Sequence, residues 1–88
     1  MKNQNRFTIQ VKKGNNGLDV FLNTGAKDHY IVTRRSNDLL RKRLSGGISI
    51  GELKRAKPRS SRSEQKYYEC TRYLLRVVND FINHELVA

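Results

Sequence analysis

The first third of the chain alternates between apolar and polar residues with the two-residue period of a half-buried β-strand. Arg6–Lys12 places a Phe, an Ile and a Val on the same face, and Leu18–Asn23 and His29–Arg34 form two more such runs. The intervals 13–17 (KGNNG) and 24–28 (TGAKD) are rich in Gly, Asn and Asp, residues that turns between antiparallel strands use. The pattern predicts a three-stranded antiparallel meander with one apolar face for a helix to cover.

The period of the pattern changes after Arg35. Ser36 or Asn37 can accept a hydrogen bond from the first turn of a short helix, which we expect to run to about Leu44. The following Ser-Gly-Gly, residues 45–47, is typical of a helix end.

A second short helix is marked by the spacing of Ser49 and Glu52, which is that of a capping box. This helix is expected to begin at Ile50. Pro58 ends it by Lys57 or earlier, because proline lacks the backbone N–H and restricts the residue before it.

A long helix follows, because Ser61 and Glu64 repeat the capping-box spacing and helical periodicity then continues to about Leu86. Its apolar stripe consists of Tyr67, Cys70, Thr71, Leu74, Val77, Val78, Phe81, Ile82 and Leu86. The predicted fold is a single small α+β domain spanning residues 1–88: a three-stranded meander, two short helices, and a long C-terminal helix packed on the sheet. Residues 1–5 are expected to be flexible and residues 57–63 to form a polar linker before the long helix.

The charge of the chain is large and concentrated in its middle. Eighteen Lys and Arg residues against eight Asp and Glu give a net charge of +10 over 88 residues. Residues 33–66 contain eleven basic and three acidic residues, and so carry +8 of it. A solvated helix surface normally mixes both signs, since Glu–Lys pairs stabilise helices. Incidental solvated charge is the alternative interpretation, but so one-signed a segment favours a surface that binds a polyanion.

Nucleic acid is the polyanion that such a surface most often binds, and we expect DNA rather than RNA. Basic side chains displace counterions from the phosphate backbone, and Arg adds forked hydrogen bonds to phosphate or guanine. The strands lack the aromatic pair of an RNA-recognition sheet. The predicted contact residues are Arg34, Arg35, Arg41, Lys42, Arg43, Lys54, Arg55, Lys57, Arg59 and Arg62.

The run Gly47-Ile48-Ser49, with Leu53 six residues after the glycine, resembles the turn and second helix of a helix-turn-helix DNA-binding motif. The resemblance covers about seventeen residues from Leu40 onward. It departs from the motif at Arg43, where a small residue is usual, and at Pro58, which shortens the second helix. The other interpretation is a pair of short capped helices that bridge the sheet and the long helix.

Residues for other chemistry are sparse. Cys70 is the only cysteine, which excludes an internal disulfide and favours a reducing, cytoplasmic location; it fits a core position. His29 and His84 have no partners at metal-ligand or triad spacing, so we expect no enzyme activity, metal or cofactor. Acid-x-lysine pairs at Glu52 and Glu64 fall on helix starts, away from the strand position that metal-dependent nucleases use.

Tyr67, Tyr68 and Tyr73 cannot all face the sheet from one helix. Tyr67 is expected in the core, and the other two are expected to be partly buried, with exposure and base stacking as the alternative.

A different function remains open from sequence: a small basic adaptor or inhibitor that docks on an acidic protein, such as a nucleic-acid-processing enzyme. That role would be consistent with a bacterial or mobile-element protein. Membrane binding is not expected, because the basic helices lack a wide apolar face to insert. The sequence does not predict an oligomeric state.

Overall fold

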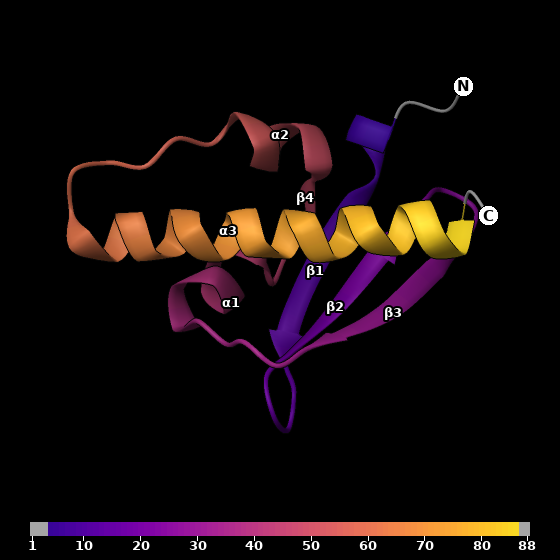
Figure 1. Cartoon of the computed structure of the whole chain (residues 1–88), viewed down its shortest axis with the longest axis horizontal. Helices are drawn as coiled ribbons and strands as arrows, with labels where there is room; N and C mark the ends of the chain where they lie inside the picture. The colour runs from indigo at the N-terminus through magenta and orange to yellow at the C-terminus, as the bar shows by residue number, and fades with distance from the viewer. Residues whose placement is uncertain (1–3, 87–88) are drawn as a thin grey trace.

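A computed structural model of the chain describes residues 4–86. In this part of the chain one antiparallel sheet has the strand order β3-β2-β1-β4, and a long helix lies across it (Figure 1). The strands are β1 (Thr8–Lys13), β2 (Leu18–Asn23), β3 (Asp28–Thr33) and β4 (Ile48–Ser49). The helical elements are the 3₁₀ turn η1 (Gln4–Arg6), α1 (Asp38–Leu44), α2 (Ile50–Arg55), α3 (Arg62–Phe81) and the π-helical turn η2 (Ile82–Leu86). The α+β class is confirmed.

The predicted meander is present as β1, β2 and β3. Val11 pairs with Val20 between the first two strands, and Phe21 pairs with Tyr30 between the second and third. The sheet also has a fourth strand that the alternation did not predict. β4 returns beside β1, with Ile48 opposite Ile9, and two residues are too few to show a period.

The core lies between one face of the sheet and α3. The strands contribute the alternate apolar residues Ile9, Val11, Leu18, Val20 and Leu22, and Phe7 adds to them just before β1; all are nearly inaccessible to solvent. The helical elements contribute Tyr67, Leu74 and Val78 from α3, Ile82 from η2, Leu40 and Leu44 from α1, and Ile50 and Leu53 from α2. Full burial of one such side chain contributes about 1.5–3 kcal/mol to folding, so this face holds the domain together.

All three helix starts expected from the sequence are observed. The Asn37 side chain accepts a hydrogen bond from the Leu40 N–H at 2.9 Å, so Asn37 rather than Ser36 caps α1. The Ser49 and Ser61 hydroxyls accept from the backbone N–H groups three residues later, each at 3.2 Å. These bonds satisfy N–H groups that the helix itself leaves unpaired.

Several segment boundaries differ from the prediction. β1 begins at Thr8 rather than Arg6, and the long helix changes to π-helical geometry at Ile82 before it reaches Leu86. α2 ends at Arg55 and α3 already begins at Arg62, so the connection between these helices is 56–61 rather than 57–63. Within the expected flexible stretch 1–5, residues 1–3 lie outside the described part, whereas Gln4 and Asn5 belong to η1.

The opposite face of the sheet is left open. Phe21 and Tyr30 stack there across β2 and β3, with ring centroids 5.4 Å apart, and the Lys12 ammonium lies 5.4 Å from the Phe21 centroid. Tyr30 and Val32 are 53% and 64% exposed. The tyrosine hydroxyl donates to Asp19 at 2.7 Å, and this hydrogen bond raises the pKa of Tyr30.

The hairpin loop before β2 approaches the end of β3 closely at Gly17. A Cβ at this position would lie 2.0 Å from the backbone oxygen of Thr33. We predict that Gly17→Ala lowers the free energy of unfolding by about 1–3 kcal/mol, because backbone must move to admit the methyl group. Gly46→Ala is the matched control, since a Cβ there meets no atom within 4 Å. Urea denaturation measures both variants, and equal midpoints would contradict the observed packing.

Candidate nucleic-acid interface

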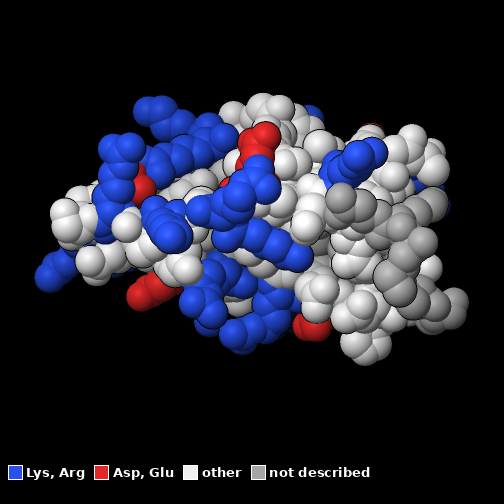
Figure 2. Space-filling model, turned by 90° about the horizontal axis from the view of Figure 1, so that it is seen from above, with Lys and Arg blue, Asp and Glu red and all other residues white. Residues whose placement is uncertain are grey.

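Most basic residues of the middle segment come from α1, α2, the beginning of α3 and the connection between the last two helices. α1 and α2 lie on either side of α3 in Figure 1, and the connection 56–61 leads from α2 to the beginning of α3. Figure 2 shows Lys and Arg side chains gathered over one half of the face seen there, with few carboxylates among them. The predicted residues in these elements are Arg41, Lys42 and Arg43 of α1, Lys54 and Arg55 of α2, Lys57 and Arg59 of the connection, and Arg62 of α3.

Two of these arginines are ion-paired. Arg41 contacts Asp38 at 3.3 Å, one turn earlier on α1. Arg43 makes a forked contact with Glu64: Nη1 donates to Oε2 at 3.0 Å and Nη2 donates to Oε1. Across residues 4–86, these are the two ion pairs within 4.0 Å. Two of the three carboxylates in the basic segment are therefore already bound.

The Arg43–Glu64 pair links α1 to the first turn of α3. The Arg43 guanidinium also lies 4.6 Å from the ring centroid of Tyr67, which is buried as predicted. Its hydrogen bonds lower the pKa of the Glu64 carboxyl, with a smaller contribution from the charge of Arg59. Burial raises the pKa of the Tyr67 hydroxyl. Arg43 is thus part of the folded framework as well as of the basic surface.

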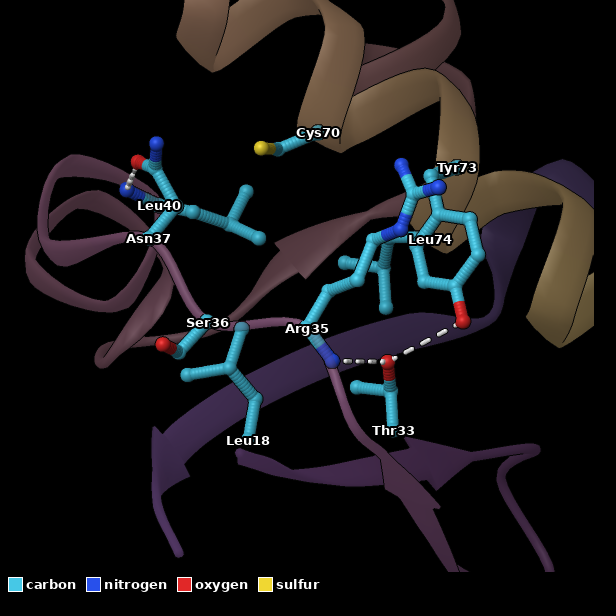
Figure 3. A pocket seen from close by; sticks show the side chains of 9 residues that line it. All are labelled: Leu18, Thr33, Arg35, Ser36, Asn37, Leu40, Cys70, Tyr73 and Leu74. Atoms are coloured by element: carbon cyan, nitrogen blue, oxygen red, sulfur yellow. Dashed lines mark hydrogen bonds between the residues drawn. The ribbon is translucent and has the colours of Figure 1, made fainter. Parts of the chain in front are cut away.

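Arg35 is also engaged within the fold. Its guanidinium lies 4.3 Å from the Tyr73 centroid, and its backbone N–H donates to the Thr33 hydroxyl at 3.3 Å (Figure 3). The cavity beside it, which Cys70 and Leu74 help to line, measures about 10 Å³, so it has room for one water molecule at most. Arg35 therefore packs against α3, and this cavity is too small for an organic ligand.

Seven of the ten predicted residues have neither an ion pair nor a cation–π contact in the described part of the chain, and all seven are exposed. They are Arg34, Lys42, Lys54, Arg55, Lys57, Arg59 and Arg62. Lys54 donates a hydrogen bond to the Asn5 side chain at 3.3 Å, which leaves its charge uncompensated. The structure thus separates the predicted set into a framework group and a larger exposed group.

The two remaining tyrosines of α3 are half-buried, as expected. Arg35 covers Tyr73, and Arg72 lies 5.8 Å from the Tyr68 centroid. Each contact places a guanidinium near one face of its ring, where a base would otherwise stack.

The helix pair differs from a helix-turn-helix. β4 lies between α1 and α2 and pairs with β1, and the two helices flank α3 (Figure 1). α2 has only six residues, as Pro58 implied. The bridging pair of short capped helices is the arrangement observed.

Among residues 4–86, no group of three or more His, Cys, Asp or Glu side chains lies close enough together to hold a metal ion. Glu52 and Glu64 occupy first turns of helices, as expected, and Glu64 is held by Arg43. A search of the same residues for a helix with the length and hydropathy needed to cross a bilayer finds none.

Comparison of the chain with protein-family models, with curated protein sequences and with solved structures gave no match.

The Arg43–Glu64 pair predicts a pH-dependent stability. Because the folded-state pKa of Glu64 lies below its ordinary value of 4.5, the pair stabilises the fold fully above that value. The stabilisation is lost as the pH falls through the lowered pKa. We expect Glu64→Gln to have a lower urea midpoint than the wild type at pH 7, with the difference disappearing in strong acid.

Glu69→Gln is the matched control, because Glu69 lies exposed on α3 and has no ion pair in residues 4–86. It should shift the midpoint little at either pH. Equal midpoints for Glu64→Gln and the wild type at pH 7 would show that the pair does not stabilise the fold.

Proposed function

We propose that the chain is a non-catalytic nucleic-acid-binding protein that prefers DNA and binds it through its exposed basic surface. The observation that carries the proposal is the exposed group of seven basic residues, six of which lie on α1, α2, the connection 56–61 and the first turn of α3. Its members lack carboxylate partners in residues 4–86, so their charges are uncompensated within the fold. A phosphate backbone supplies the missing charge, and the release of its counterions provides the free energy of binding.

The covered tyrosines support duplex over single-stranded nucleic acid. Proteins that bind single strands without sequence preference combine a basic groove with exposed aromatic rings on which bases stack. Here the aromatic rings nearest the basic segment, Tyr67, Tyr68 and Tyr73, each have an arginine within 6 Å of the centroid. The surface therefore favours contacts to the phosphates of a duplex over stacking on the bases of a single strand.

The size of the molecule limits the site. Its longest extent is 38 Å, which corresponds to about 11 base pairs of B-DNA at 3.4 Å per base pair. A duplex of this length is therefore sufficient as a minimal probe.

The direct test is fluorescence anisotropy with labelled single- and double-stranded DNA and RNA across a salt series. We expect micromolar or tighter binding to duplex DNA, with a log–log salt slope that corresponds to roughly four or more released counterions. Absence of binding to all four ligands at low salt would contradict the proposal, and an acidic protein would then be the partner to seek.

A triple substitution tests where the DNA lies. Lys57→Gln, Arg59→Gln and Arg62→Gln together remove three exposed charges without breaking an observed ion pair. If each contacts one phosphate, the magnitude of the salt slope should fall by about 2–3 and the affinity should fall with it. The matched control neutralises Lys13, Lys27 and Arg76, which are exposed and lie outside the basic segment. Equal losses in both variants would show that binding depends on net charge rather than on this surface.

A further inference from the structure

β3 is an unprotected edge of the sheet. It pairs with β2 on one side, and no strand within residues 4–86 pairs with its other side (Figure 1). An edge strand presents unpaired N–H and C=O groups that can pair with another chain, and sheets usually protect such edges with Pro, Lys or a bulge. β3 reads DHYIVT and contains neither Pro nor Lys.

The side chains at this edge are apolar as well. Tyr30 and Val32 project from the open face of the sheet, and they are two of the three exposed large hydrophobic residues in the described part of the chain. The Tyr30 ring stacks on the ring of Phe21 in the neighbouring strand β2, with an interplanar angle of 24°. A short apolar row therefore begins inside the sheet and ends at its unpaired edge.

The residues of the edge are arranged symmetrically about Ile31. Tyr30 and Val32 are its immediate neighbours. Asp28, the first residue of β3, lies three positions before it, and Arg34, in the bend just after the strand, lies three positions after it. In an antiparallel pair of two identical strands centred on this residue, each Tyr30 faces Val32 of the second copy. Each Asp28 faces Arg34 of the second copy, so opposite charges meet at both ends of the pair.

We propose that two copies of the chain associate through β3 about a two-fold axis at Ile31 and form one continuous antiparallel sheet. A two-fold interface requires a self-complementary surface, and the edge segment 28–34 has this property in both hydrophobicity and charge. Each copy carries +10, so most of its surface repels a second copy. β3 lies at the opposite edge of the sheet from β4, which leads directly into the basic α2. The inference does not depend on nucleic-acid binding.

Sedimentation velocity over a protein concentration range of about 1–300 µM tests the association at physiological salt. The apparent mass of the wild type should rise with concentration from that of one chain, 10.2 kDa, toward twice that value. Asp28→Arg places Arg opposite Arg, and Arg34→Asp places Asp opposite Asp. Each variant alone should weaken the dimer by about tenfold or more, because two attractive pairs become repulsive.

An equimolar mixture of Asp28→Arg and Arg34→Asp provides the decisive test. In the mixed dimer both charge pairs are again opposite, so association should return to the wild-type level. Glu69→Arg and Arg76→Asp are the matched controls, since they make the same charge changes at exposed positions of α3 and should leave the dimer intact. Asp28→Arg also removes a 2.7 Å hydrogen bond from Asn23, so circular dichroism must show that it is folded.

Val32→Lys is the substitute if Asp28→Arg does not fold, because the 64% exposed side chain of Val32 tolerates a polar replacement. It should also yield a monomer. A wild type that remains monomeric throughout the range would overturn the proposal. A dimer that these variants leave unchanged, or folded variants whose mixture stays monomeric, would do the same.

Discussion

Burial of one apolar sheet face beneath α3 is the interaction on which this fold depends. The apolar face of a small meander needs a covering element, and most of the stability of a helix in a protein comes from packing of its apolar face. Ile9, Val11, Val20 and Leu22 meet Leu74 and Val78 in a contact that stabilises both. Sheet and helix are distant in sequence, so the segment between them must pass around α3. It contributes four apolar side chains to the core and leaves its charged side chains outside.

The position of the charge is thus a consequence of the chain path. α1, α2 and the connection 56–61 surround the N-terminal part of α3, and each brings basic residues to the surface. The Arg43–Glu64 pair offsets a small part of this charge and fixes α1 against α3. The remaining positive charges repel one another in the compact state. A bound polyanion relieves that repulsion and stabilises the folded state by mass action.

Much of the fold is predictable from local patterns. Alternation at positions such as Ile9 and Val20 specifies the strands, and the Ser49 and Ser61 spacings specify where helices begin. β4 escaped prediction because its two residues acquire strand geometry only through pairing with β1. Contacts between residues distant in sequence were not predicted either, because they too depend on the tertiary fold. Nothing near Arg43 in the sequence indicates Glu64, twenty-one residues later, as its partner.

The basic surface was only partly predictable. Net charge by segment identified which residues carry it, because charge needs no knowledge of packing. Which of them the fold uses depends on tertiary geometry, as the stacking of Arg35 on Tyr73 shows. The self-complementary edge at β3 could be recognised only from the strand order. In the middle of the sheet, the same six residues would pair with a strand on each side.

Chemical-shift mapping tests the central claim most directly, with ¹⁵N-labelled protein titrated with a duplex of about 11 base pairs. The account predicts that backbone amide shifts change mainly in α1, α2, the connection 56–61 and the first turn of α3. Little change is expected in the C-terminal half of α3 and in η2. Shift changes confined to those C-terminal elements or to β3, or no changes at all, would contradict it.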